Sequence, residues 1–308
     1  MNTQEIPSNL KRLYKHWDLH IGPITNQIKP ESICQDQNLL KEILWFIGER
    51  IAIWQKKIEG GMPPHTDDPI LATYKFTNIF REFDRQTIEF HTLLNPLRDN
   101  FPLWLLNMFY CRMVARPETI RYAGLLSFDK DSNKLVYEKL IHSPRPRYGT
   151  PYVFPISVIQ RGPTPTRELF IAKYLPSIME GVAMEIMKWK NIPVYEGVEK
   201  VLAIFKYRLR FHWTEVLIDT AYQFPDFINL FGRFPIGPGA APTLAKIDTE
   251  KDPSFLVTEL AKIRLETNIT FEDQPLRLSA ENWEGIACEF RKYTNLKQGK
   301  GRRRIYHS

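Results

Sequence analysis

Residues 38–58 read NLLKEILWFIGERIAIWQKKI, and the apolar side chains of this stretch repeat at helical spacing. Glycines and prolines at positions 60–64 predict the end of that helix. The same spacing predicts further helices over residues 8–20, 104–114, 117–126, 166–189, 194–206, 212–222, 254–267 and 280–293. The sequence therefore predicts a mainly α fold.

The character of the sequence changes between residues 125 and 165. Residues 126–140 (LSFDKDSNKLVYEKL) are compatible with a hairpin that turns at residues 131–133. Six prolines follow, and PYVFPISVI at residues 151–159 is the extended run among them. We therefore expect a small β element around residues 125–160 within the helical fold.

Composition indicates a globular protein with a basic end. The chain has 308 residues, 43% of them hydrophobic, and a formal net charge of +7. Residues 297–308 carry five cations and no acid, so they either form a solvated end or contact phosphates. We predict an N-terminal helical extension (1–60), a large helical domain (61–296) and a basic tail (297–308).

Several protein classes are not supported by the sequence. The P-loop, GxGxxG, GxSxG, HExxH and CxxC motifs are absent, and the three cysteines are too widely spaced for a zinc site. The longest apolar stretch, residues 101–110, is too short to span a bilayer. The N-terminus has no apolar signal segment. We therefore expect an intracellular protein, cytoplasmic in a bacterial host or nuclear in a eukaryote, with no membrane partner.

The most informative segment is TDDPILATYKFTNIFREFDR at residues 66–85. It predicts a helix that begins at residues 65–69 and continues through Phe83, with Asp67 and Asp68 at its positive end. On such a helix Arg81 and Arg85 share one face, which suits phosphate oxygens. For the two acids, simple capping of the helix is the alternative to a functional role. Pairing of Arg81 with Asp84, and of Arg85 with Glu82 or Glu89, is the alternative for the arginines.

Two later motifs complete the set of candidates. FPIGPGA at residues 234–240 follows a predicted hydrophobic helix, and its Gly237 and Gly239 would let backbone N–H groups approach a phosphate, although plain turns share this pattern. CEFRKY at residues 288–293 brings Glu289 and Lys292 onto neighbouring helical positions. Cys288 has no identifiable activating base, so we expect a packed thiol there.

HTDDPIL followed by FTNIFREFDR resembles the helical domain of 5-hydroxymethyluracil DNA kinases and their relatives, the α-glutamyl/putrescinyl thymine pyrophosphorylases. MFYCRMVARPETIRYAG, GTPYVFPI, the helix with Glu215 and Asp219, GPGA and CEFRKY extend the resemblance to residues 62–304. A histidine at position 65 departs from the tryptophan of many relatives. The resemblance implies a helical fold remotely similar to helix-hairpin-helix DNA glycosylases. Since the kinases carry a separate P-loop domain, the sequence favours the transferase branch.

The resemblance implies a phage-type DNA hypermodification enzyme, with residues 61–296 as its catalytic and DNA-binding domain. It would transfer an amino acid or polyamine onto pyrophosphorylated 5-hydroxymethyluracil in DNA and release pyrophosphate, after flipping the base out of the duplex. Arg81, Arg85 and Lys292 are candidates for stabilising the leaving group. Asp67, Asp68 and Asp84 are candidates for activating the amine, with Asn78, Asp219 and Glu289 in second rank. Gly237, Gly239, Lys300, Arg302, Arg303 and Arg304 are candidates for binding the DNA backbone.

Alternatives remain open at this point. The paired acids could equally hold a divalent metal that bridges the pyrophosphate, and no other cofactor is indicated. A glycosylase-like activity would require Asp219 or Asp248 near the sugar. A third hypothesis is a non-catalytic DNA-binding accessory protein. The sequence does not identify the amine that would be transferred.

Overall fold

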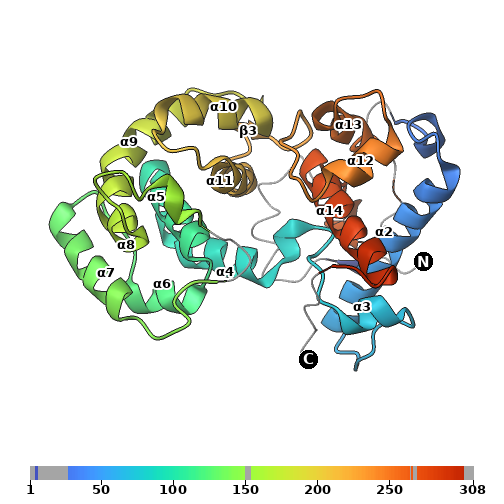
Figure 1. Ribbon diagram of the computed structural model, residues 1–308, viewed down its shortest axis with the longest axis horizontal. Helices are drawn as coiled ribbons and strands as arrows, with labels where there is room; N and C mark the ends of the chain where they lie inside the picture. Colours follow the sequence, from blue (N-terminus) through green and yellow to red (C-terminus); the bar gives the residue numbers. More distant parts are fainter. Residues whose placement is uncertain (1–3, 6–26, 150–153, 264, 266–268, 302–308) are drawn as a thin grey trace. The chain divides into compact units, whose positions relative to one another are not determined.

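The computed structural model describes residues 4–5, 27–149, 154–263, 265 and 269–301. It is mainly helical, as the sequence predicts, and it divides into two compact units (Figure 1). Unit 1 combines residues 1–84 with residues 230–308, and unit 2 is the continuous segment 85–229. The predicted division at residues 60/61 and 296/297 stays a prediction.

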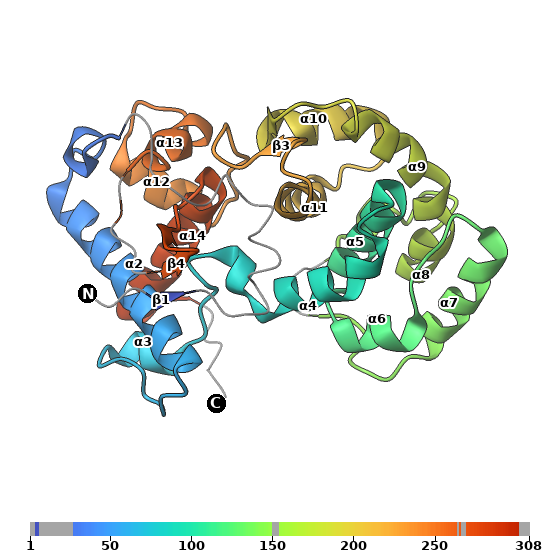
Figure 2. The same cartoon turned by 180° about the vertical axis from the view of Figure 1, so that it is seen from behind.

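Unit 1 is organised around the long C-terminal helix α14 (Ala280–Lys297), which packs on the other helices of the unit (Figure 2). These are α2 (Gln37–Ile58), α3 (Pro69–Thr73), α12 (Ala241–Ile247) and α13 (Pro253–Leu260). Short 3-10 turns cover Pro30–Ser32 and Arg81–Phe83. In the small sheet of this unit, β4 (Ile269–Phe271) pairs in parallel with β1 (Gln4–Glu5) and antiparallel with β5 (Gln274–Pro275).

Capping side chains fix where the long helices of unit 1 begin. The Asp36 carboxylate accepts hydrogen bonds from the N–H groups of Asn38 and Leu39, so α2 starts at the position that its periodicity predicts. Ser279 and Asn282 form a reciprocal capping box at the start of α14. Both caps supply acceptors for helix N–H groups that have no partner within the helix.

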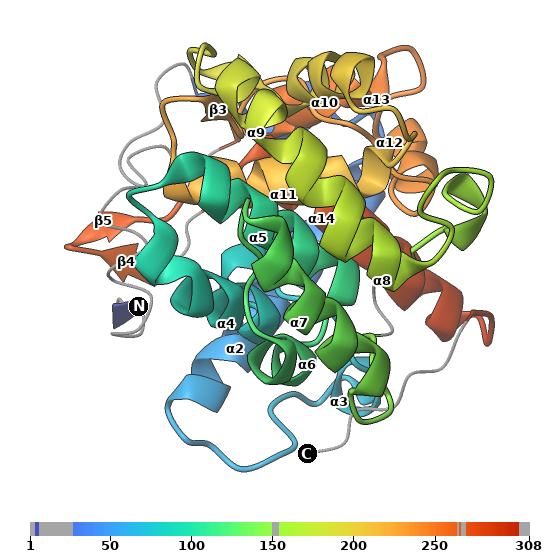
Figure 3. The ribbon, with the colours of Figure 1, turned by 90° about the vertical axis from the view of Figure 1, so that its left-hand side faces the viewer.

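Unit 2 surrounds the hydrophobic helix α5 (Phe101–Val114), in which every side chain from Trp104 to Val114 is buried. Helices α9 (Leu175–Ile186), α11 (Arg210–Gln223) and α4 (Arg85–Leu94) pack against it (Figure 3). The remaining helices are α6 (Pro117–Ala123), α7 (Lys130–His142), α8 (Arg167–Leu169) and α10 (Val194–Ile204). A π-helix, Phe170–Tyr174, joins α8 to α9. Shorter elements are 3-10 turns at Asn95–Leu97 and Ile156–Val158, and the parallel pair β2 (Ile192–Pro193) and β3 (Ile228–Asn229).

The hairpin predicted within the β element around residues 125–160 is wrong, and the extended run predicted at residues 151–159 lies partly outside the described residues. Helix α7 occupies the position of the expected hairpin, and the described residues of this segment contain no strand. Asp129 caps α7 by accepting hydrogen bonds from the N–H groups of Asp131 and Ser132. The polar run that suggested a turn is therefore a helix start, because the same residue types favour both structures.

The predicted helix from residue 69 to Phe83 is also wrong, although Asp68 does cap its first turn. Helix α3 ends at Thr73, and the backbone from Tyr74 to Phe80 is not helical. Arg81 and Arg85 therefore do not share one face of a continuous helix. The apolar side chains of this segment are still buried, because Phe76, Ile79 and Phe80 enter the core from an irregular loop and Phe83 from the 3-10 turn that follows.

Three other expectations differ from the structure. Helix α13 ends at Leu260 rather than near residue 267. No helix leads directly into the turn at residues 234–240, because α11 ends at Gln223 and the turn opens into α12. The predicted helix over residues 8–20 lies outside the described residues. Within the described part of the chain, no helix is long and apolar enough to cross a membrane.

Candidate functional site

Asp68 is fully occupied by its neighbours in unit 1. Its Oδ1 accepts hydrogen bonds from the N–H groups of Ile70 (2.9 Å) and Leu71 (2.8 Å), and its Oδ2 accepts one from the Tyr293 hydroxyl (2.9 Å). Burial, and next this hydrogen bond to Asp68, raise the pKa of Tyr293. Asp68 therefore joins the start of α3 to the last turns of α14, and it has little capacity left for a reacting molecule.

Asp67, the preceding acid, is in the opposite situation. It is exposed, and its carboxylate makes no hydrogen bond or ion pair with any described residue. Its neighbour Thr66 is buried, donates a hydrogen bond from Oγ1 to Glu49 of α2, and accepts one from the Asp68 N–H at 3.1 Å. The turn that carries Asp67 is therefore held on both sides, while the carboxylate itself is open to solvent.

The FTN segment that follows is held by side chains from both ends of the chain. The Arg50 guanidinium of α2 donates hydrogen bonds to the backbone carbonyls of Phe76 (3.3 Å) and Thr77 (3.0 Å). From α14, Glu289 accepts a hydrogen bond from the Thr77 N–H at 3.2 Å, and Lys292 donates one to the Lys75 carbonyl. These bonds replace the helical hydrogen bonds that the sequence led us to expect.

The Phe76 ring lies between two cations. Its centroid is 5.5 Å from the Arg50 guanidinium carbon and 4.4 Å from the Lys292 Nζ. Lys292 also lies 3.5 Å from the Glu289 carboxylate, and neither side chain is fully buried. Burial lowers the pKa of Arg50, which is only 7% exposed. The loop is therefore anchored on a buried guanidinium and bordered by an ion pair within reach of solvent.

The remaining candidates of residues 78–85 fall into two groups. The Asn78 N–H donates a hydrogen bond to Asp84 Oδ1 at 3.2 Å, which closes the loop that contains Arg81. Arg85 begins unit 2 and pairs with Glu89 at 2.6 Å, as the surface-pairing alternative predicts. Its side chain is 87% exposed, so this pair has little effect on stability.

The glycine-rich turn at residues 234–240 packs against α14. The Gly237 N–H donates a hydrogen bond to Glu284 at 3.1 Å, and the Pro238 carbonyl accepts one from Arg291 at 2.7 Å. A Cβ atom on Gly239 would lie 2.4 Å from the Cys288 Sγ, so a side chain at position 239 does not fit. Burial raises the pKa of Cys288 to about 11, consistent with the packed thiol that we predicted. These glycines therefore serve close packing, whatever further contacts they make.

The second-rank candidate Asp219 lies in the interior of unit 2. Arg112 binds both carboxylate oxygens, at 2.5 Å and 2.6 Å, and His91 Nε2 lies 3.2 Å from Oδ1. The side chains of Asp219 and His91 are completely buried, and that of Arg112 is 1% exposed. Such a geometry is typical of a structural ion cluster. Asp248, the other candidate for a glycosylase-like acid, accepts hydrogen bonds from the N–H groups of Glu250 and Lys251, which lower its pKa.

The other predicted DNA contacts lie mostly beyond the described residues. Lys300 is exposed, whereas residues 302–304 lie outside the described part of the chain. The described residues contain no cluster of three or more His, Cys, Asp or Glu side chains suited to a metal ion. The divalent metal stays a prediction.

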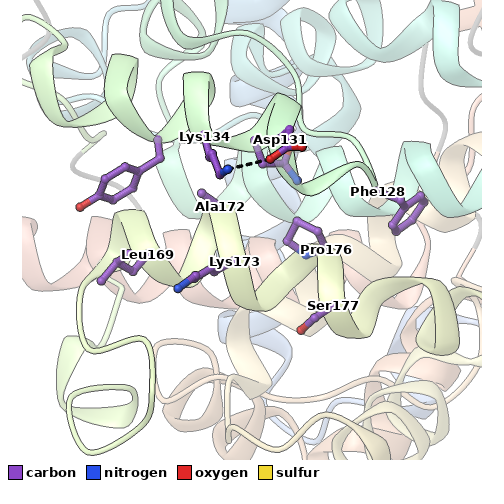
Figure 4. Close-up of a pocket in the computed structure, with 10 residues that line it drawn as sticks. Phe128, Asp131, Lys134, Leu169, Ala172, Lys173, Pro176 and Ser177 are labelled. Carbon is purple, nitrogen blue, oxygen red and sulfur yellow. Dashed lines mark hydrogen bonds and ion pairs between the residues drawn. The ribbon is translucent and has the colours of Figure 1, made fainter.

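Unit 2 contains a cavity of about 590 Å³ between α7 and the helical segment from α8 to α9 (Figure 4). Apolar side chains such as Phe128 and Pro176 line it together with Lys134, Lys173 and Ser177. Lys134 pairs with Asp131 at 2.7 Å. None of the predicted site residues lines this cavity, although its size suits a small organic molecule.

Sequence reasoning missed Arg50, Glu49 and Tyr293. Arg50 carries the clearest signal, because it lies four residues after Phe46 and four before Trp54 on the apolar face of α2. An arginine within an apolar stripe must find buried acceptors, and here these are backbone carbonyls. The acceptors themselves are 26 and 27 residues away, so the sequence does not name them.

Part of this chain is similar to known proteins. Residues 37–122 match a family described as the helical domain of 5-hmdU DNA kinase. A stretch of 98 residues is 38% identical to a 5-hmdU DNA kinase from Bacillus phage SP10 and covers 29% of this chain and 15% of that protein. This chain is related to 5-hmdU DNA kinases over that segment. No solved structure matches.

The matched segment covers α2 to α6 and includes the TDDP and FTN motifs. The predicted relation to the kinase helical domain is thereby confirmed for residues 37–122. The related segment begins at residue 37 rather than at residue 62 as we predicted, so it includes α2. The resemblance of residues 123–304, the pyrophosphorylase branch and the similarity to helix-hairpin-helix glycosylases stay predictions.

Proposed function

We propose that this protein acts in thymine hypermodification of DNA, transferring an amino acid or polyamine onto pyrophosphorylated 5-hydroxymethyluracil. One observation carries the proposal. The TDDP and FTN motifs, which lie in the segment related to 5-hmdU DNA kinases, contact CEFRKY through the Tyr293–Asp68 and Thr77–Glu289 hydrogen bonds. Motifs separated by more than 200 residues are thus assembled around one loop.

The proposed reaction is a substitution at the methylene carbon of the modified base. A C–N bond forms from the amine lone pair, and the C–O bond to pyrophosphate breaks, with the electron pair leaving on the pyrophosphate oxygen. The nitrogen loses one proton to a base. Such a step requires a carboxylate near the amine and cations near the leaving group.

The contacts of each candidate residue indicate which of these roles it can take. The Asp67 carboxylate makes no contact with the described residues, so we propose that it accepts the proton of the amine. Asp68 instead positions the turn and Tyr293. Lys292 has three N–H donors, and after bonding Lys75 it can still donate to a pyrophosphate oxygen. We assign leaving-group stabilisation to Lys292 with Arg81. Arg85 has a weaker claim, because Glu89 holds it.

DNA is the proposed macromolecular substrate. The target base would be flipped out of the duplex, at a cost of a few kcal/mol, before substitution occurs. The basic residues from Lys297 onward and the glycine-rich turn are the proposed backbone contacts. A divalent metal bound by Asp67 with the pyrophosphate would be compatible with this arrangement, because hard cations prefer oxygen ligands.

The proposal is tested with duplex DNA that contains 5-pyrophosphoryloxymethyluracil. The protein is incubated with this DNA and a pool of amino acids and polyamines, and nucleosides are analysed by mass spectrometry while pyrophosphate is measured. We expect an aminated thymidine and one pyrophosphate per adduct, and the same DNA with ordinary thymine is the control.

Other outcomes would overturn the transferase. Abasic sites would indicate a glycosylase, and unchanged DNA that is nevertheless bound would indicate an accessory protein. Because the relative is a kinase, 5-hydroxymethyluracil DNA and ATP are supplied in a parallel reaction. Phosphorylation there, without amination in the first reaction, would assign phosphoryl transfer instead.

A further inference from the structure

Unit 2 contains a second polar cluster, separate from Asp219, around Arg147 and Glu168. Glu168 accepts hydrogen bonds from Arg147 at 2.9 Å and from the Tyr148 hydroxyl. Arg147 also bonds Ser143 Oγ at 3.1 Å and the Ile141 carbonyl. This carboxylate and this guanidinium therefore neutralise each other and are well supplied with partners.

Arg167 adds a second cation to the cluster without a second acid. Its guanidinium carbon lies 4.0 Å from the Tyr148 ring centroid and 5.2 Å from the Phe154 ring centroid. Its Nε is buried without a hydrogen-bond partner, and the described residues offer the side chain no other hydrogen bond. With Arg147, Arg167 and Glu168 together, the cluster carries an excess of one positive charge. Arg167 is half-buried, and holding such a charge partly away from water without an anion is costly.

Two further buried groups, next to the Phe154 and Tyr148 rings that contact Arg167, lack hydrogen-bond partners. His212 is 2% exposed, its ring centroid lies 5.4 Å from that of Phe154, and its Nε2 has no hydrogen bond. Burial, followed by the charge of Arg167, lowers its pKa to about 4, so its imidazole is neutral at neutral pH. Tyr110 is fully buried, and its hydroxyl also has no partner. Burial raises its pKa, and the neighbouring Tyr148, whose ring packs on Arg167, contributes to the same shift.

The unsatisfied groups share one chemical character. A guanidinium only donates hydrogen bonds, and a tyrosine hydroxyl and a neutral imidazole can each donate one. Their natural complement is an oxygen-bearing anion, which would also balance the excess charge. A single water molecule would satisfy one or two of these groups but would leave the charge unbalanced.

We propose that unit 2 has an anion-binding site at Arg167, completed by His212 and Tyr110, for a ligand that carries a carboxylate or a phosphoryl group. The site uses none of the residues assigned to the transfer reaction. It therefore stands or falls independently of the proposed function, and its test requires neither DNA nor turnover.

The test is calorimetric titration of the full-length protein in a zwitterionic buffer with inorganic phosphate and, separately, acetate. Sodium chloride at the same ionic strength is the reference for screening. We expect saturable binding of at least one oxyanion and no comparable binding of chloride. Tighter binding of phosphate would identify a phosphoryl ligand, and tighter binding of acetate a carboxylate.

The decisive variant is Arg167→Met, which keeps an unbranched apolar stem and removes the charge and the N–H donors. We expect it to weaken oxyanion binding about 10-fold or more, the effect of losing one hydrogen bond to a charged group. Arg161→Met is the matched control, because Arg161 is exposed and makes no hydrogen bond or ion pair with the described residues. Equal binding by wild type, Arg167→Met and Arg161→Met, or no binding by wild type, would overturn the proposal.

A second variant keeps the proposal testable if Arg167→Met fails to fold. Tyr110→Phe removes one buried hydroxyl and no ring, so the core around α5 stays filled. We expect it to fold and to weaken oxyanion binding several-fold. If Tyr110→Phe binds the oxyanion as wild type does, Tyr110 is not part of the site and the proposed geometry is wrong.

Discussion

Each unit contains an arginine that is more than nine-tenths buried, but the two arginines have different acceptors. In unit 2, Arg112 binds both oxygens of Asp219, and both side chains are buried. In unit 1, Arg50 binds two backbone carbonyls of an irregular loop, and the charged pair Glu289–Lys292 nearby remains within reach of solvent. The first arrangement joins helices, whereas the second fixes a loop that borders on solvent.

The difference shows how to choose between candidate acids. Asp219 is embedded among hydrogen bonds and has no exposed surface, so it belongs to the fold. Asp67 has no partner among the described residues and is exposed beside a loop that other side chains hold in place. Catalytic groups need both access and a rigid surrounding, and unit 1 provides this combination.

The largest expected effect is the loss of the charge on Asp219. In Asp219→Asn, Arg112 becomes a buried charge without its counter-ion, which costs about 3–5 kcal/mol of stability. Urea denaturation followed by tryptophan fluorescence would measure it. Asp226→Asn is the control, since Asp226 is exposed and should change stability by no more than about 0.5 kcal/mol. Equal stabilities of the two variants would mean that the cluster is not structural.

Arg50 provides the corresponding test in unit 1. Arg50→Gln removes a charged donor from the carbonyls of Phe76 and Thr77, and we expect a loss of about 1.5–3 kcal/mol in stability. Proteolysis within residues 74–80 should become faster as well. Lys41→Gln, on the same helix and exposed, is the control. If cleavage of this loop is unchanged in Arg50→Gln, the loop is held by other contacts.

His212 gives unit 2 a dependence on pH. Its pKa in the folded state is about 4, below the ordinary 6.5, so the unfolded chain binds more protons between these values and stability falls as the pH is lowered. From pH 7 to pH 5 in a zwitterionic buffer, the wild type should lose about 2 kcal/mol more than His212→Gln. Parallel pH profiles of the two proteins would contradict the buried, neutral imidazole.

The sequence predicts long helices better than it predicts the loop of the candidate site. The apolar repeat in α2 and the capping acids before Pro69 are local signals, and they predict the helix starts that the structure has. The segment 74–83 also has apolar residues at helical spacing, yet it is not an α-helix, because distant groups such as Glu289 bond its backbone. Contacts across more than 200 residues leave no periodic trace in a single sequence.

The smallest expected effect on stability, and the sharpest test of the site, comes from the adjacent acids Asp67 and Asp68. Asp68→Asn weakens a helix cap and the bond to Tyr293, so it should lower stability by about 1 kcal/mol. Asp67→Asn removes no contact with the described residues and should leave stability unchanged. Urea denaturation of the two variants would show this difference.

The rate of amination should be lowered more by Asp67→Asn than by Asp68→Asn, the reverse of their effects on stability. If Asp67 accepts the proton of the amine, Asp67→Asn lowers the rate of amination about 100-fold or more, the usual contribution of a general base. Asp68→Asn should retain more activity than Asp67→Asn once its stability is restored at lower temperature. The two variants differ by one position and remove the same charge, so a change in net charge cannot explain a difference between them. Full activity in Asp67→Asn would mean that another group accepts the proton. The next acid along this loop is Asp84, which accepts a hydrogen bond from the Asn78 N–H.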